Sequence, residues 1–187
     1  MTHTLDILRN EHRNIGFLLE LLARQADLLE HSGQPDLKLI TEITDYFRSY
    51  PDMYHHPKED LVLGRLRQRV SALEPAIAEL ESEHDELSDE LHDFSRTVVA
   101  LLTDPCPATR AEFLKSARHF IVRERQHMAD EERFLFPAAE KSLTEGDWAE
   151  IDEVVGRFSD PMSEPDNKHR FILLRDRLSE WQRGDAA

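Results

Sequence analysis

The sequence predicts an all-α protein, an antiparallel up-down-up-down four-helix bundle with a C-terminal helical extension. Apolar residues recur at spacings of three and four over long stretches, which is the period of an amphipathic helix. No segment alternates apolar and polar residues for long, and the 187 residues include only six glycines, so strands and tight turns are disfavoured. We expect the bundle to occupy residues 1–142 and the extension residues 143–187.

The first half of the bundle is predicted to hold two helices. The first apolar stripe indicates a helix over Thr4–His31, and the Gly- and Pro-containing segment 32–36 ends it. A second helix begins near Ile40 and continues to about Leu66. Pro51 and Pro57 should interrupt or kink it, because proline lacks the amide hydrogen and clashes with the preceding turn.

The second half repeats this plan and is followed by shorter helices. Apolar stripes over 77–101 and 113–138 indicate the third and fourth long helices, and Phe134 belongs to the second of these stripes. In the extension, Thr144 and Asp147 have the spacing of a weakened capping box. It should open a short helix from Trp148 to about Phe158, and a linker over 159–166 then leads to a last helix over 169–181.

The composition excludes several classes of function. Lys and Arg number 23 and Asp and Glu 38, so the net charge is −15 and binding to nucleic acid or anionic lipid is disfavoured. No apolar run approaches the roughly 20 residues of a membrane span, and the polar N-terminus lacks the pattern of a secretory signal. With Cys106 as the single cysteine no intrachain disulfide can form, and we expect a cytoplasmic protein.

An internal repeat carries the chemistry. The two halves of the bundle align at an offset of 72 residues, and in each half 43 residues separate a first histidine from a His-x-x-x-Glu pair. The repeat pairs are Glu11 with Glu83, His12 with His84, His55 with His127, Glu59 with Glu131 and Asp60 with Glu132.

These histidines and glutamates occupy apolar stripes, where unpartnered polar groups would cost several kcal/mol in rough terms. The spacing of four places each His-x-x-x-Glu pair on one helix face. A dinuclear metal site would supply the compensating charge, with iron, manganese or zinc as the metals suited to imidazole and carboxylate. The predicted ligands are His12, His55, Glu59, His84, His127 and Glu131. Both carboxylates and a solvent oxygen would bridge two ions about 3.5–4 Å apart.

Other polar residues near these positions receive different interpretations. His56 should point about 100° away from His55, so we expect it at the rim of the site or against a ligand residue rather than as a ligand itself. Tyr54 could approach the site. Glu124 is either an acceptor for a ligand N–H or a solvated residue at the end of the bundle. The remaining histidines are expected on the surface: His3, His31, His92, His119 and His169.

A rival metal site has the Glu-x-x-His motif of ferritin-like proteins, at Glu81/His84 and Glu124/His127. That pattern needs a lone glutamate on each of the other two helices. The repeat mates there are Arg9 and Asp52, and the histidines of the first half would have no role. The His-rich set is therefore favoured.

Four strings resemble the hemerythrin-like, or HHE cation-binding, domains: Leu8-Arg-Asn-Glu-His-Arg-Asn14, Tyr54-His-His-Pro-Lys-Glu-Asp-Leu61, Glu83-His-Asp-Glu-Leu87 and His127-Met-Ala-Asp-Glu-Glu-Arg-Phe-Leu-Phe-Pro137. The resemblance covers about residues 3–158. It implies a four-helix bundle with a non-haem diiron site that is carboxylate- and oxo- or hydroxo-bridged, held by the six ligands above. Oxygen-carrying hemerythrins have a fifth histidine on the third helix, where this chain has Ser88. The resemblance therefore implies a more open site.

Three uses of such a site remain open. The first is a protein that binds or senses O2, NO or iron through the open dinuclear site, with the extension reporting to a protein partner. The alternative is a diiron redox enzyme in oxidative or nitrosative stress defence, with weak catalase-like or ferroxidase activity. The third is a helical interaction protein with a structural metal.

Overall fold

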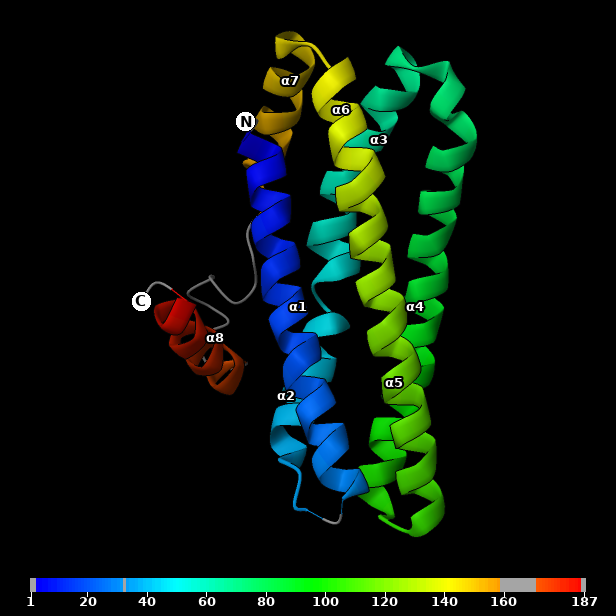
Figure 1. Cartoon of the computed structure of the whole chain (residues 1–187), viewed down its shortest axis with the longest axis vertical. Helices are drawn as coiled ribbons and strands as arrows, with labels where there is room; N and C mark the ends of the chain where they lie inside the picture. Colours follow the sequence, from blue (N-terminus) through cyan, green and yellow to red (C-terminus); the bar gives the residue numbers. More distant parts are fainter. Residues whose placement is uncertain (1–2, 32, 159–170, 186–187) are drawn as a thin grey trace.

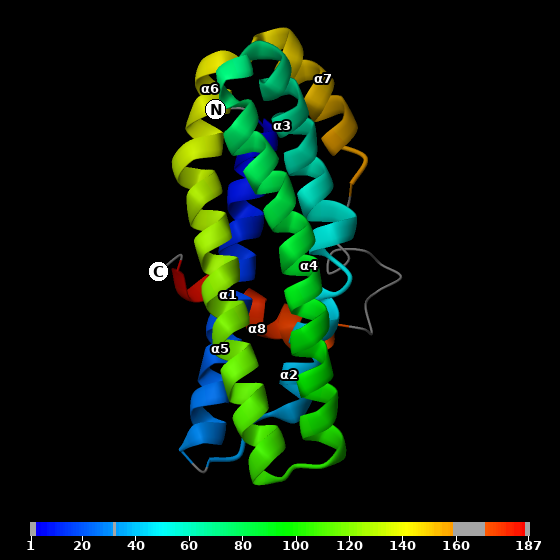
Figure 2. The same cartoon turned by 90° about the vertical axis from the view of Figure 1, so that its right-hand side faces the viewer.

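The computed structural model describes residues 3–31, 33–158 and 171–185, and it confirms the all-α bundle. Four long rods run side by side along the main axis of the molecule, in alternating direction (Figures 1 and 2). The first is α1 (His3–Glu30), and the third is α4 (Glu74–Thr103). The second consists of α2 (Leu37–Phe47), the π-helical turn η1 (Pro51–His55) and α3 (His56–Arg69). The short 3-10 turn η2 (Ser71–Leu73) leads into α4. The fourth rod consists of α5 (Pro107–Asp130), the π turn η3 (Glu131–Leu135) and α6 (Phe136–Ser142).

The second rod is broken where its prolines predict. Helix α2 ends at Phe47, Pro51 opens the π turn, and Pro57 lies in the first turn of α3. Within the π turn the His56 amide donates to the Pro51 carbonyl, five residues earlier. A π turn holds one residue more than an α turn, so it changes which side chains face the bundle interior.

The fourth rod contains the second π turn, and there one expectation is wrong. Phe134 belongs to the apolar stripe of the sequence, yet its side chain is 58% exposed. Because η3 spans Glu131–Leu135, the helical phase shifts within the stripe. Leu135 and Phe136 are buried instead, at 3% and 0% exposure.

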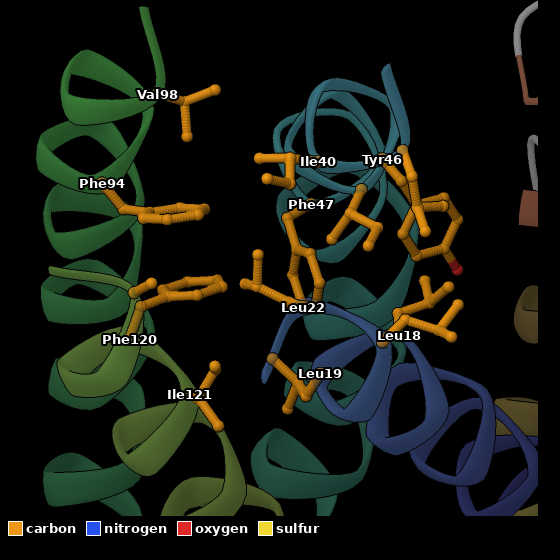
Figure 3. Packing of buried hydrophobic residues seen from close by; sticks show 14 of the residues in the cluster. Leu18, Leu19, Leu22, Ile40, Tyr46, Phe47, Phe94, Val98, Phe120 and Ile121 are labelled. Atoms are coloured by element: carbon orange, nitrogen blue, oxygen red, sulfur yellow. The ribbon is translucent and has the colours of Figure 1, made fainter. Parts of the chain in front are cut away.

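The bundle contains two apolar clusters. The larger one joins α1, α2, α4 and α5, where the rings of Phe94 and Phe120 stack 5.0 Å apart and the Phe47 ring meets Phe120 edge-on at 5.1 Å (Figure 3). The smaller one lies at the other end of the bundle, around α3 and α6. On α1, Leu8 belongs to the smaller cluster and Ile15 to the larger one. The predicted ligands therefore form a polar layer between two apolar cores.

Both described helices of the extension pack on the bundle. Helix α7 (Glu145–Val155) begins with the predicted capping box of Thr144 and Asp147. Its Trp148 belongs to the smaller apolar cluster. Helix α8 (Ile172–Asp185) lies across α1 and α2 (Figures 1 and 2), and Leu174 belongs to the larger cluster.

The helix predicted over 169–181 is thus observed from residue 172, while the predicted linker and His169 lie outside the described residues. The division of the chain after residue 142 stays a prediction. Among the described helices, none combines the length and the apolar character that crossing a membrane requires.

Candidate metal centre

The six predicted ligand residues converge in one layer of the bundle. Each of the four rods contributes at least one of them. All are buried, with exposures between 0% and 8%: His12 from α1, His55 from η1, Glu59 from α3, His84 from α4, His127 from α5 and Glu131 from η3.

Glu59 faces both histidine pairs. Its Oε1 atom lies 3.2 Å from Nε2 of His12 and 3.2 Å from Nε2 of His55. Its Oε2 atom lies 3.6 Å from Nε2 of His84. The carboxylate of Glu59 thus directs one oxygen toward the histidines of the first half and the other toward a histidine of the second half.

Glu131 does the same from the opposite rod. Its Oε2 atom lies 3.4 Å from Nε2 of His12. Its Oε1 atom lies 3.6 Å from Nε2 of His84 and 3.5 Å from Nε2 of His127. The two carboxylates therefore define two neighbouring positions, which we call position A (beside His12 and His55) and position B (beside His84 and His127).

Several buried atoms of this centre lack a hydrogen-bond partner in the described part of the chain. They are Oε2 of Glu59, Nε2 of His84 and His127, and both carboxylate oxygens of Glu131. Buried polar atoms are nearly always partnered, since an unsatisfied one costs about 1–3 kcal/mol. Nitrogen and oxygen lone pairs that converge in this way fit a borderline or hard divalent cation.

The outer ring nitrogen of each histidine pairs with a second carboxylate. The Nδ1 atoms of His12 and His55 lie 3.0 Å from Glu132 and 2.9 Å from Glu11. The Nδ1 atoms of His84 and His127 lie 3.5 Å from Asp60 and 3.0 Å from Glu83. An Nδ1–H that donates to a carboxylate leaves the Nε2 lone pair pointing inward, which is the tautomer that a metal needs.

The sequence does not identify these four outer carboxylates as partners of the histidines, although it contains a signal for them. Glu11 and Glu83 precede the first histidine of each half, and Asp60 and Glu132 follow the ligand glutamate. All four obey the offset of 72 residues. Their pairing across helices is what the repeat alone does not reveal.

One buried cation distinguishes the two halves. Lys58 is 2% exposed, forms an ion pair with Glu11, and has its Nζ atom 5.6 Å from the centre of the Tyr50 ring. The repeat position holds Asp130, which is half-buried and accepts a hydrogen bond from Gln126. The ammonium group of Lys58 therefore compensates the charge of Glu11, the carboxylate that pairs with His55. In the second half, the position of Lys58 holds an acidic residue, Asp130.

The pKa values follow from burial and from the crowding of carboxylates. Burial, with the charge of Glu131 added, raises the pKa of Glu59 to about 8. Burial also lowers the pKa of His55 to about 3. Burial opposes a charged His84, but the carboxylates of Asp60 and Glu131 outweigh it and raise its pKa to about 10. Protons thus reside on Glu59 and His84 near neutral pH, and a cation that binds here must displace them.

His56 lies inside the centre, against a predicted ligand. The side chain is 7% exposed, and its ring stacks on that of His84 with 4.2 Å between centroids and 7° between planes. Potential ligand atoms of His56, Glu59, His84 and His127 lie within 4.8 Å of one another, as do those of His12, His55, Glu59 and Glu131. Of the two places expected for His56, the rim is therefore excluded, and the ring lies against the predicted ligand His84.

The other candidates fall outside both groups. Tyr54 is half-buried and packs against the larger apolar cluster, with its ring 6.0 Å from that of Tyr50. Glu124 is 6% exposed, so it is not a solvated end residue, and the Nδ1 atom of His127 pairs with Glu83.

The rival ferritin-like site is not assembled, because Glu81 pairs with Arg67 instead. Among the histidines expected on the surface, the described ones are exposed: His3, His31, His92 and His119.

A comparison with protein-family models matches residues 3–139 to the model described as the hemerythrin HHE cation binding domain. That span covers all four rods up to α6 and includes every residue of the centre. No curated protein matches the chain.

Proposed function

Because the chain belongs to the hemerythrin HHE cation-binding family, we propose that its centre holds two non-haem iron ions and binds or senses a small ligand such as O2 or NO. The observation that carries this proposal is the shared orientation of Glu59 and Glu131. Each presents one oxygen to position A and the other to position B. Two carboxylates placed in this way could each bind both ions of a dinuclear site.

The residues present suit this group. His12 and His55 would hold the ion at position A, His84 and His127 the ion at position B, and the two glutamates would join them. A bound iron pair supplies redox-active metal to which O2, NO or peroxide can coordinate. The chain itself holds the imidazoles in one tautomer through the outer carboxylates and keeps bulk water out with an apolar core on each side.

A redox enzyme that decomposes peroxide or oxidises ferrous iron is the second candidate. It draws on the buried carboxyl of Glu124 one turn before His127, and on the Tyr50 ring that stacks on His55 at 6.3 Å. Peroxide turnover distinguishes the two uses. The enzyme predicts turnover that is lost in Glu59→Ala and Glu131→Ala, and turnover unchanged in both variants would contradict it. A cytoplasmic location and a partner for the extension remain predictions.

Elemental analysis after anaerobic loading with ferrous iron and desalting tests the metal centre. We expect about two irons per chain in the natural protein. His55→Ala and His127→Ala should each lower this value sharply, because each removes one of the two predicted histidine ligands of its position. Stoichiometry near zero in the natural protein would contradict the diiron proposal.

Matched controls are available on the same helices. His92 on α4 and His119 on α5 are exposed histidines that lie outside both groups. His92→Ala and His119→Ala should retain about two irons. A similar loss of iron in these controls would point to nonspecific binding by surface histidines.

A further inference from the structure

The outer carboxylate of the first half belongs to a buried ion pair. One oxygen of Glu11 lies 2.9 Å from Nδ1 of His55, and the other pairs with the ammonium group of Lys58. Both members of the ion pair are buried, Glu11 at 8% and Lys58 at 2% exposure. The pair as a whole is neutral, so His55 donates to an acceptor whose charge is compensated.

The equivalent carboxylate of the second half has no such partner. The Oε2 atom of Glu83 lies 3.0 Å from Nδ1 of His127. In the part of the chain that the structure describes, no lysine or arginine nitrogen comes within 4.0 Å of Glu83. Arg123 acts on it only through space, because its guanidinium donates to two other glutamates at 3.0 Å. His127 therefore donates to an acceptor that keeps its negative charge.

The place of the Lys58 ammonium is fixed by two groups that also contact His55. The first is the carboxylate of Glu11. The second is Tyr50, whose ring centre lies 5.6 Å from Nζ of Lys58 and whose ring stacks on that of His55 at 6.3 Å. An aromatic face attracts a cation at this distance. The ammonium is thus held one carboxylate away from the outer nitrogen of His55.

The charge of an outer carboxylate affects the metal through the imidazole. An anionic acceptor on Nδ1–H raises the basicity of the ligand nitrogen, and hydrogen bonding and charge near the ligands are among the means by which a protein sets a metal's reduction potential. A negative charge favours the higher oxidation state, and a compensated one favours the lower. The remaining outer carboxylates, Glu132 and Asp60, are exposed to similar extents, 47% and 53%, so solvent screens the charge of each. The main difference between the two positions is therefore the ion pair of Lys58.

We propose that Lys58 is a positioning residue that acts through Glu11 on His55 and makes iron at position A easier to reduce than iron at position B. This inference rests on the proposed diiron site. It identifies position A as the one that keeps ferrous iron when the centre is half oxidised. In a sensor of oxidising conditions, position A would be the last to lose its ferrous ion.

An anaerobic redox titration of the iron-loaded protein tests this assignment through its two one-electron steps. Lys58→Met should lower the equilibrium constant of the first reduction step about tenfold, which is about 59 mV for one electron. Glu83→Gln should raise that of the second step by a similar factor, because it removes the charge beside His127 and keeps a hydrogen-bond acceptor. Both variants then bring the two steps closer together, by shifts of opposite sign. A merely structural disturbance gives no reason for opposite signs.

The double variant Lys58→Met/Glu11→Gln covers the case in which Lys58→Met alone does not fold. It replaces a neutral ion pair by an uncharged acceptor, so both steps should stay within about threefold of the natural protein. A tenfold rise of the first step in this double variant would show that the charge of Glu11 acts uncompensated, and would overturn the proposal.

The single variants are equally decisive. An unchanged first step in Lys58→Met, or an unchanged second step in Glu83→Gln, overturns the proposal while the two irons and the diiron centre stand. A natural protein that takes up no iron contradicts the centre itself, and this inference with it.

Discussion

The two halves of the bundle agree at the centre and differ around it. Residues 3–69 and 74–142 supply the same ligand types and the same outer carboxylates at a constant offset. They differ in where the π turn falls. In the first half, η1 ends at His55, the first residue of the His-x-x-x-Glu segment. In the second half, η3 begins at Glu131, the last residue of that segment. The comparison teaches that the two halves present the same ligand types to the centre, although the π turn lies before the His-x-x-x-Glu segment in one half and after it in the other.

The largest expected effect is that of pH on the stability of the metal-free protein and on its affinity for metal. The pKa of Glu59 is raised to about 8 and that of His84 to about 10. Both groups hold more protons in the folded state than in the unfolded chain between pH 6.5 and 8, so the metal-free protein should lose stability as pH rises through this window. Metal binding displaces the same protons, so affinity should increase about tenfold per pH unit for each proton displaced.

Thermal melts at pH 6.5, 7.2 and 8.0, with and without ferrous iron under anaerobic conditions, check this expectation. The melting temperature of the metal-free protein should fall across the series, and the increase caused by iron should grow. An iron-induced increase that is the same at all three values would mean that Glu59 and His84 do not exchange protons for metal.

The next largest effect concerns the unfolding free energy of variants at Lys58 and at its repeat mate Asp130, which carry opposite charges. Lys58→Met leaves the carboxylate of Glu11 buried without its ammonium partner. Breaking a buried ion pair in this way should cost about 3–5 kcal/mol of unfolding free energy. Asp130→Asn, at the repeat position, should stay within about 0.5 kcal/mol. Urea unfolding measures both.

The double variant Lys58→Met/Glu11→Gln serves as the control, because it removes the uncompensated charge and should recover part of the loss. Equal and small effects at Lys58 and Asp130 would show that the buried ammonium does not distinguish the halves.

Much of this molecule is predictable from its sequence, and the reason is the repeat. Helical spacing identifies the four rods, and the duplicated His and His-x-x-x-Glu pattern selects the residues that converge. The apolar spacing places Phe134 wrongly and leaves the position of His56 open for a common reason: both adjoin a π turn, and their orientation depends on its one extra residue. The spacing of apolar residues in the sequence does not show where a turn holds this additional residue. The outer carboxylates were missed because each pairs with a histidine of another helix.

A smaller effect on the unfolding free energy is expected where the π turn changes the helical phase near Phe134. Val62 and Phe134 are repeat mates, but Val62 is 0% exposed and Phe134 58%. Val62→Ala should cost about 2 kcal/mol, because it opens a cavity in the smaller apolar cluster. Phe134→Ala should change the unfolding free energy by less than about 0.5 kcal/mol. Urea unfolding of the two variants side by side decides this, and a comparable loss at both positions would show that the phases of the two halves agree after all.

The smallest effect concerns Gly16 and its repeat mate Ser88, each one turn beyond a first histidine. A Cβ atom added at Gly16 would meet no heavy atom within 4 Å, so close helix packing does not require this glycine. Gly16→Ala should therefore stabilise α1 by about 0.5–1 kcal/mol, since alanine has the higher helix propensity. Ser88→Ala should gain less, because serine is already the better helix former of the two. Chemical denaturation of both variants measures the difference, and iron stoichiometry should stay unchanged. A loss of stability or of iron in Gly16→Ala would mean that the open space beside His12 is part of the centre.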